Sequence, residues 1–345
     1  MKGRGDFNWL RSTATTLEIA GWILDPWREA ERIRVLVNDA VAAEAPPGNR
    51  DDLATAFQWI AHARRSGFDF SLPRPAGRSS VTVEALRGRR VLVRASTTFA
   101  PELEGTPVPG PDLLLRILPE PNPLLYKASG LFSYSCFLAA LAGRVDLATC
   151  PRMLDWGCGS GRLASLFLAT RPGPEVFGCD IDGEATAWCA ANLPGGQFTK
   201  SGPYPPLPYA DGFFPFAIAY SVFTHLGSEV QKTWLEELRR VIAPGGILLA
   251  TVNGLQLAAW TFPETGRSRL SRLLFPRRRP AFLEPGFFDS GADHALDGVA
   301  PEGYYRGVFQ TPEWTRTEWS RFFEVVEVLE AGMHGFQDIV VLRRR

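Results

Sequence analysis

The chain has 345 residues, with 37 basic and 37 acidic side chains and a formal net charge of zero. This balance argues against a protein that binds nucleic acid or an anionic membrane surface as a whole, because such proteins carry a basic surplus. The five cysteines are odd in number and none lies in a Cys-x-x-Cys pair, which excludes a disulfide framework and a zinc site.

No targeting or membrane-spanning segment is expected. The opening residues Met1–Asp6 lack the apolar stretch of a signal peptide, and no uninterrupted apolar run is long enough to cross a bilayer. We therefore expect a cytoplasmic protein without an integral membrane segment. At this length the chain can form two domains, each with its own core.

Residues 15–100 have the pattern of short β-strands. Apolar side chains alternate with polar ones in Leu17–Ile19, Ile33–Val37 and Val81–Ala85. The strand Val91–Val93 follows the tight link around Gly88, which predicts a β-hairpin. Short strands separated by proline and glycine are typical of a β-sandwich, so an all-β domain is predicted over residues 1–118.

The texture changes after a proline-rich, charged segment, Thr98–Asn122, which we interpret as a linker. A helix is predicted over Leu131–Leu141, and strands then alternate with helices, which indicates an α/β domain with a doubly wound parallel sheet over residues 119–345. The last two strands, Phe322–Leu329 and Asp338–Leu342, are joined by a link too short for a helical crossover. They are therefore predicted to pair antiparallel.

A glycine-rich turn follows the first strand of this second domain. Asp155 ends the strand, and three glycines spaced two apart precede a helical stretch, at Gly157, Gly159 and Gly161. The helix N-terminus suits a carboxylate and Asp155 suits an ammonium group, so the pair fits an amino acid such as the methionine part of S-adenosylmethionine (SAM). A dinucleotide site is the competing interpretation, but its third glycine would fall at Arg162. A purely structural turn is the other alternative.

A second acidic residue lies where a ribose-binding carboxylate is expected. Asp180 ends the predicted strand Glu175–Cys179, 19 positions after Gly161, close to the interval found in nucleotide-binding βαβ units. Ile181 can lie against an adenine ring. Asp182 is better placed to cap the following helix, Gly183–Asn192, although a capping role for Asp180 itself is the alternative.

Five motifs in order make residues from about 126 to 345 resemble a class I SAM-dependent methyltransferase, of the group found beside glycosyltransferases and other surface-glycan or natural-product enzymes. They span residues 154–162, 178–182, 206–213, 220–226 and 234–246. The resemblance implies a mostly parallel seven-stranded sheet, SAM as cofactor and S-adenosylhomocysteine (SAH) as product. It implies cofactor contacts by Asp155, Gly157, Cys158, Gly159, Gly161, Asp180, Ile181, Tyr220 and Ser221. Pro215 departs from the motif, where the family usually has an acid.

The first domain bears a looser resemblance to an accessory β-sandwich attached to bacterial glycosyltransferases and some methyltransferases. The similarity lies in Gly21–Pro26, Arg50–Leu53 and Ser66–Phe70. Together the two resemblances imply methylation of a hydroxyl group on a sugar, glycan or related metabolite. N-methylation of an amino sugar is one alternative, and a non-catalytic SAM- or carbohydrate-binding scaffold is another.

His225 is the leading candidate for a general base, because it follows the fourth strand and a neutral imidazole is available near pH 7. A structural role in shaping the loop is the alternative, and His294, with Asp293 beside it, is the rival base. No metal site is expected. The expected partner is a small-molecule or glycan acceptor, with no nucleic acid, and the sequence leaves the oligomeric state open.

The segment Asn253–Thr311 has little periodicity and is predicted to be a lid over the acceptor. Its arginines could meet a phosphate or carboxylate, although a solvated charge run is equally consistent with the pattern. The arginines are Arg267, Arg269, Arg272 and Arg277–Arg279, and the aromatic residues are Phe275, Phe282, Phe287, Phe288, Tyr304 and Tyr305.

Overall fold

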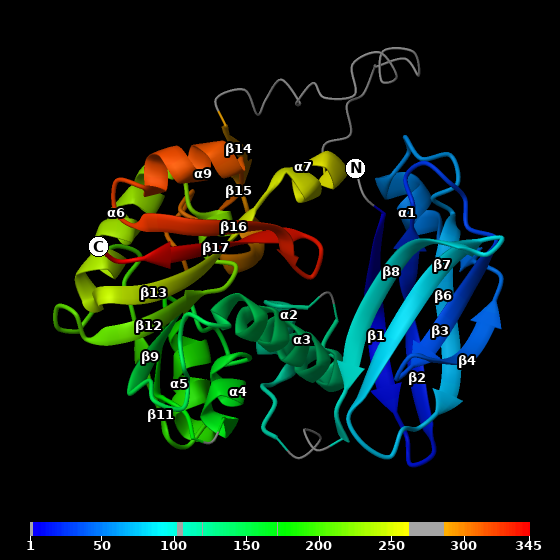
Figure 1. The fold of residues 1–345 in the computed structure, drawn as a ribbon, viewed down its shortest axis with the longest axis horizontal. Helices are drawn as coiled ribbons and strands as arrows, with labels where there is room; N and C mark the ends of the chain where they lie inside the picture. Colours follow the sequence, from blue (N-terminus) through cyan, green and yellow to red (C-terminus); the bar gives the residue numbers. More distant parts are fainter. Residues whose placement is uncertain (1–2, 102–105, 119, 171, 262–285) are drawn as a thin grey trace. The chain divides into compact units, whose positions relative to one another are not determined.

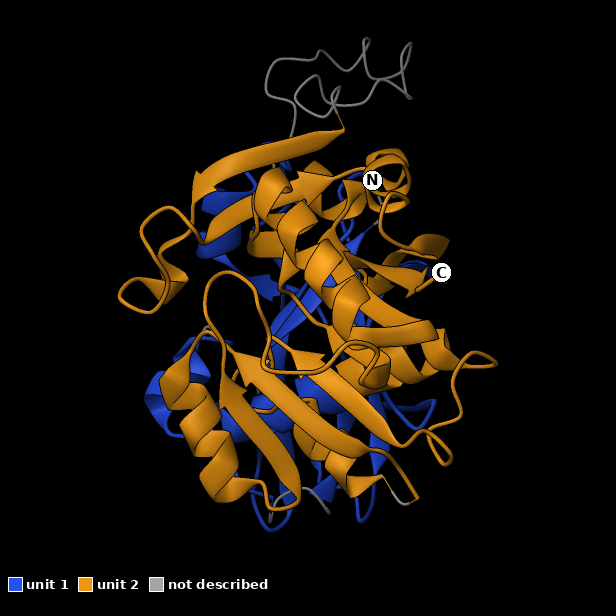
Figure 2. Ribbon diagram, turned by 90° about the vertical axis from the view of Figure 1, so that its left-hand side faces the viewer, with its two compact units in different colours: residues 1–132 blue, residues 133–345 orange. Residues whose placement is uncertain are grey.

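A computed structural model describes residues 3–101, 106–118, 120–170, 172–261 and 286–345 of the chain. The chain divides into two compact units, Met1–Phe132 and Ser133–Arg345, which Figure 2 distinguishes by colour. Each unit has a hydrophobic core of its own.

The first unit consists of two four-stranded sheets, in the orders β1-β2-β6-β5 and β4-β3-β7-β8 (Figure 1). Its elements are β1 Arg4–Ser12, β2 Thr16–Leu24, β3 Arg32–Val37, β4 Ala40–Ala45, β5 Gly48–Asn49, α1 Asp51–Ala56, β6 Arg65–Pro73, β7 Ser79–Arg87, β8 Arg90–Phe99 and α2 Pro111–Leu115. All strand pairs are antiparallel. Apolar side chains from both sheets share one core, and the predicted hairpin at Gly88 is present, with φ of +58° at that glycine.

The predicted linker is largely part of the first unit. Helix α2 and the residues after it place Leu114 and Leu118 in the core of the two sheets, and Leu113 is buried as well. Proline and charge therefore did not indicate a free connection here, because the buried leucines after Gly110 anchor the segment. This explains why the compact units divide after Phe132, whereas the sequence placed the domain boundary after residue 118.

Helix α3, Pro123–Leu141, is longer than the predicted helix and crosses this division. Leu125 and Tyr126 in its first half belong to the core of the first unit, and Phe137 and Leu141 in its second half belong to a core of the second unit. Among the described residues, α3 is the one helix long and apolar enough to span a bilayer, and half of that stretch is buried inside the protein. The apolar composition of α3 is explained by its packing, because it contributes side chains to two hydrophobic cores.

The second unit is built on a seven-stranded sheet in the order β11-β10-β9-β12-β13-β17-β16 (Figure 1). Its elements are β9 Arg152–Trp156, α4 Ala164–Ala169, β10 Glu175–Asp180, α5 Gly183–Asn192, β11 Gly196–Lys200, β12 Phe214–Ala219, η2 Phe223–His225, α6 Ser228–Val241, β13 Ile242–Asn253, α7 Leu255–Thr261, β14 Phe287–Ala292, η4 His294–Leu296, β15 Arg306–Gln310, α9 Pro312–Trp319, β16 Glu324–Met333 and β17 Gln337–Arg343. Strands β9 to β13 run parallel, and β17 pairs antiparallel with both β13 and β16. The predicted doubly wound sheet with its antiparallel final hairpin is thus confirmed.

Both faces of this sheet are covered. Leu154 packs in one core with Trp234 of α6 and Trp319 of α9, while its neighbour Met153 packs in another with Phe167 of α4. Strands buried on both faces read as continuous apolar runs, which is why the sequence predicted them well. The sheet therefore presents its carboxyl edge, where β9, β10 and β12 end, as the place for a ligand.

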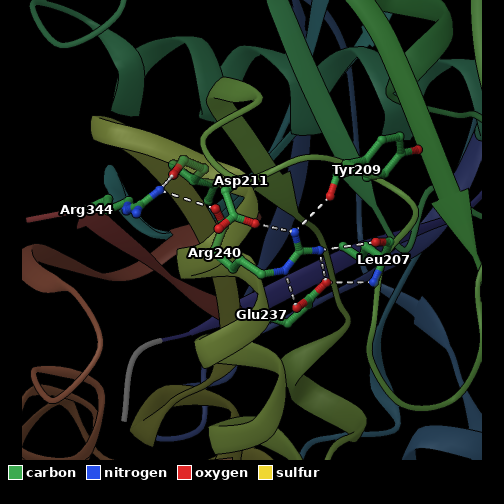
Figure 3. Close-up of polar contacts among 7 residues, drawn as sticks. Leu207, Tyr209, Asp211, Glu237, Arg240 and Arg344 are labelled. Atoms are coloured by element: carbon green, nitrogen blue, oxygen red, sulfur yellow. Dashed lines mark hydrogen bonds and ion pairs between the residues drawn. The ribbon is translucent and has the colours of Figure 1, made fainter.

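The loop before β12 is fixed to α6 by one arginine (Figure 3). Arg240 donates hydrogen bonds to the Tyr209 carbonyl (2.8 Å), the Leu207 carbonyl (3.2 Å) and Asp211 Oδ1 (2.7 Å), and pairs with Glu237 at 2.6 Å. The Leu207 N–H in turn donates to Glu237 Oε1 (2.6 Å). The motif over residues 206–213 therefore contributes a structural clamp.

Pro215 lies beside this loop, in the first residues of β12. The register of β12 against β13 shifts between Phe214 and Phe216. An irregular position of this kind suits a residue without an N–H group, so the proline is accommodated without a lost ladder bond in mid-strand.

Candidate active site

The glycine-rich turn follows the carboxyl end of β9. Gly157, Gly159 and Gly161 all have positive φ, at +76°, +50° and +73°. A Cβ at Gly157 would lie 2.2 Å from Val222 Cγ2, so that glycine is required by packing. A Cβ at Gly159 would have no described atom within 4 Å. Gly159 is therefore the position at which a ligand can approach the loop backbone.

Asp155 is buried below this turn and keeps one oxygen without a hydrogen-bond partner. Its exposed fraction is 2%, and Oδ2 is the unpartnered atom among the described residues. Burial, together with the charge of Asp180, raises the pKa of Asp155 to about 7, against the opposing effect of the Ala164 N–H. A buried carboxylate oxygen with no donor is stabilised by a cation, so this site fits the ammonium group of an amino-acid moiety.

Asp180 ties the turn to strand β10. The Gly159 N–H donates to Asp180 Oδ2 (2.7 Å) and the Asp182 N–H donates to Oδ1 (2.8 Å). Burial raises the pKa of Asp180 despite these bonds. Each carboxylate oxygen can accept a second bond, so the ribose hydroxyls can still be held there. Ile181, next to Asp180, is half-buried.

Asp182 and Cys158, which lie next to the candidate cofactor residues, have structural contacts. Asp182 caps α5, accepting from the N–H groups of Glu184 (3.0 Å) and Ala185 (3.2 Å), as predicted. Cys158 is buried, its Sγ lies 3.6 Å from the Gly159 carbonyl oxygen, and its N–H bonds the Cys179 carbonyl (3.1 Å). Its thiol therefore packs inside the protein against the glycine-rich turn.

Ser221 and Tyr220 follow the end of β12 at the same edge. Ser221 has φ of +59°, a conformation rare for a residue with a side chain, and its N–H donates to Thr251 Oγ1 (2.7 Å). Its hydroxyl accepts from Gln337 Nε2 (3.0 Å). The residues that follow β12 are thus held by hydrogen bonds from β13 and β17, both of which reach this edge of the sheet.

A set of residues that the sequence did not predict surrounds Tyr220. Ser133 on α3 donates to the Tyr220 hydroxyl (3.1 Å) and also bonds His334 Nε2 (2.7 Å). The Arg162 guanidinium lies 5.2 Å from the centre of the Tyr220 ring. Burial and the charge of Arg162 lower the pKa of His334 to about 3, so this imidazole is neutral. These residues are separated by up to 201 positions, and no local pattern connects them.

His225 lies in the short helix η2, a few residues after the end of β12. Its ring stacks on Tyr305 at a centroid distance of 4.0 Å, and Nδ1 lies 3.4 Å from Asp293 Oδ2. Nδ1 is buried with no hydrogen-bond partner among the described residues. Burial lowers the pKa of His225 to about 4, although Asp293 and a backbone bond to Arg306 act in the opposite direction. His225 is therefore a neutral imidazole near pH 7, and its buried Nδ1 faces a carboxylate oxygen.

The rival histidine is placed differently. The His294 side chain is 79% exposed and its Nδ1 lies 3.0 Å from Asp297 Oδ2. Asp293, which the sequence paired with His294, instead faces His225. Burial raises the pKa of Tyr305, and the charges of Asp293 and Asp180 raise it further.

The predicted lid is only partly described. The arginines of residues 267–279, with Phe275 and Phe282, lie outside the described residues. The remainder is more regular than the sequence indicated, since β14 and β15 pair antiparallel and carry Phe288 opposite Phe309. This hairpin brings Asp293, Tyr305 and Arg306 to His225. Within the described ranges, no group of three potential metal ligands occurs.

Comparison with known proteins agrees with this geometry. Residues 154–250 match the family model described as a methyltransferase domain. A tRNA (carboxymethyluridine(34)-5-O)-methyltransferase from Arabidopsis thaliana is 37% identical over 29% of this chain and 23% of its own length. A trans-aconitate 2-methyltransferase from Methylobacterium nodulans is 32% identical over 32% of this chain and 41% of its own length.

A solved SAM-dependent methyltransferase from Methanosarcina mazei is 19% identical, with 59% of this chain and 96% of that chain covered and a TM-score of 0.41. The chain spans less than half the length of either curated relative. The matched residues show a methyltransferase domain in the second unit, which has the sheet order expected of a class I methyltransferase. The glycine-rich turn with Asp155 and Asp180 fits SAM as its methyl donor.

Proposed function

We propose that the protein transfers the methyl group of SAM to a hydroxyl oxygen of a sugar, glycan or related hydroxylated metabolite and releases SAH. The observation that carries this proposal is the arrangement of His225. A hydroxyl group is a poor nucleophile that gains from a base, and His225 is an imidazole that burial keeps neutral near pH 7, with Asp293 Oδ2 3.4 Å from its Nδ1. The name of the Arabidopsis relative also specifies an oxygen acceptor.

The roles of the chain's own residues follow from their positions. Asp155 and Asp180 hold the ammonium and ribose ends of the cofactor on either side of Gly159, where a ligand can reach the backbone. The bound cofactor supplies an electrophilic methyl group on a cationic sulfur. Ser133 and His334 fix the Tyr220 hydroxyl beside the strand-four end. Alignment of the acceptor there can contribute up to about 7–11 kcal/mol to the lowering of the barrier.

Proton transfer completes the proposed reaction. SAM held by Asp155 and Asp180 would supply the methyl group to the acceptor oxygen, and the neutral imidazole of His225 would take up the hydroxyl proton released in that transfer. Asp293 stabilises the imidazolium that forms, and Tyr305 keeps the ring in plane by stacking. A buried imidazole resists protonation at rest, but a carboxylate beside it offsets this resistance when the proton arrives.

The acceptor class is tested by methyl transfer from labelled SAM to a panel of hydroxylated and aminated sugars and to tRNA, with products identified by mass. O-methylated sugar is the expected product. Methylated amines would favour the N-methyltransferase, and methylated tRNA would overturn the prediction that no nucleic acid is bound, which rests on the zero net charge. SAM binding without transfer to any acceptor would favour a scaffold.

The base is tested by His225→Gln and Asp293→Asn, with His294→Gln as the matched control. We expect turnover to fall about 100-fold in His225→Gln, the lower end of the range for general base catalysis, and to fall less in Asp293→Asn. SAM affinity should not change in either variant. Near-normal turnover in His225→Gln would show that the histidine only shapes the loop.

A further inference from the structure

The first unit contains a cavity that the proposed methyl transfer does not use. Its volume is about 430 Å³, within the range of pockets that hold small ligands. It lies over strands β1, β2, β5 and β6 of one sheet. The residues that line it include Asn8, Gly48, Arg50, Gly67, Asp69 and Glu120, all of them in the first unit.

Missing side chains make this hollow. Gly67 pairs with Gly48 across β6 and β5, so two neighbouring strands present bare backbone at one point. A Cβ at Gly67 would lie 2.9 Å from Arg50 Cγ, whereas a Cβ at Gly48 would meet nothing closer than 3.5 Å. Glycine inside a strand weakens it and often marks a place where a ligand comes close to the backbone.

Arg50 is held rigidly at the edge of the cavity. Its Nε and Nη2 donate to the two oxygens of Asp52, at 2.8 Å and 2.6 Å, and its Nη1 donates to Asn8 Oδ1 at 2.6 Å. Asn8 lies at the register shift in β1, where a bulge turns the strand. The guanidinium has five N–H donors, so two of them remain for a ligand, and the Asn8 amide keeps both of its own.

The charges of the lining select among ligands. Asp52 neutralises Arg50, while Asp69 and Glu120 add two carboxylates, and no described residue forms an ion pair with Asp69. An anion such as phosphate would meet this negative surplus. An ammonium group has only donors and would leave the Arg50 and Asn8 donors unsatisfied. A hydroxyl group donates to the carboxylates and accepts from the guanidinium and the amide.

We propose that this cavity binds a neutral polyhydroxylated ligand, of the class of a mono- or disaccharide, independently of the methyltransferase site. The sheet provides a bare floor against which a ring can lie. The fixed guanidinium, the amide and the two carboxylates provide a mixed set of donors and acceptors around it.

Calorimetric titration of the full-length protein tests this proposal, with a library of neutral mono- and disaccharides, inorganic phosphate and ethanolamine as probes. At least one saccharide should bind saturably. Gly48→Val, which fills the hollow without a backbone clash, and Asp69→Ala, an exposed position, should each weaken that binding at least tenfold. Gly77→Val is the matched control, because a Cβ at Gly77 meets no atom within 4 Å and the residue lies away from the cavity.

Retained affinity in both cavity variants would place the sugar elsewhere, including the acceptor site of the second unit, and would overturn the proposal. Binding of phosphate or ethanolamine without any saccharide would refute the charge argument, and the absence of all binding would refute the site. The rate of methyl transfer should be equal in Gly48→Val and wild type. A failure of the cavity proposal can therefore be distinguished from a failure of the proposed function.

Discussion

Replacing Asp155 by Asn should make the cofactor-free protein more stable and the cofactor weaker-bound. In the folded protein the pKa of Asp155 is raised from 3.8 to about 7, chiefly by burial. The folded state therefore holds a proton that the unfolded state has lost, and the free energy of unfolding falls as pH rises from 3.8 to about 7. Asparagine keeps an acceptor oxygen for the Ala164 N–H but carries no charge.

The size of the effect follows from the same shift. From pH 5 up to the folded-state pKa of about 7, the folded protein keeps a proton on Asp155 that the unfolded chain has lost. Each of these roughly two pH units lowers the free energy of unfolding by about 1.4 kcal/mol, so the charge of Asp155 destabilises the fold by about 3 kcal/mol more at pH 8 than at pH 5. Asp155→Asn should thus gain stability relative to wild type by about this amount on going from pH 5 to pH 8. SAM should bind about 1.5–3 kcal/mol more weakly, since a charge-assisted bond to its ammonium group is lost.

Urea unfolding at both pH values and calorimetry with SAM measure the two effects, with Asp112→Asn at an exposed position as control. A stability difference that does not change with pH would refute the reasoning from burial. If stability behaves as expected but SAM affinity is unchanged, Asp155 is a buried acid that does not hold the ammonium group.

Four other outcomes are expected. Gly159→Val should weaken SAM binding at least tenfold in calorimetry, whereas Gly143→Val, with φ of +72° and no neighbour within 4 Å, should show the same backbone strain and normal affinity. Equal affinity losses would mean that strain alone acts. Because the pKa of His225 is lowered to about 4, kcat/KM should be flat from pH 6 to 9, and a fall with a midpoint near 6.5 that His225→Gln abolishes would contradict this. Ser133→Ala should lower kcat about fivefold at unchanged SAM affinity, as one hydrogen bond to Tyr220 is lost; unaltered turnover would remove Ser133 from the site. Arg240→Met should lower the free energy of unfolding by about 2 kcal/mol in urea, and no change would show that the clamp is dispensable.

The sequence predicted the second unit well because its signals are local. Buried strands read as apolar runs, and Gly183–Asn192 became a helix with Asp182 as its cap, as expected. The candidate cofactor residues also follow from local spacing, since Asp155 and Gly159 lie within five positions. Pairing Asp293 with His294 failed because adjacency in sequence does not determine side-chain direction, and the β14–β15 hairpin turns Asp293 to His225.

Longer-range features could not be predicted from local patterns. The contact of Ser133 with His334 joins a helix that precedes the sheet to the hairpin that ends it. The cavity in the first unit arises from Gly48 and Gly67 on paired strands together with Arg50, and no single motif contains all three.

The continuous helix α3 has a practical consequence for dissecting the protein. A fragment that begins at residue 119 would carry Leu125, Tyr126 and Ala128 without the sandwich residues that shield them from water, and one that ends at residue 118 would lose three apolar plugs from its interior. Either fragment should aggregate or fold poorly for reasons unrelated to its binding or catalytic activity. A negative result from an isolated half would therefore say nothing about what that half does in the intact chain.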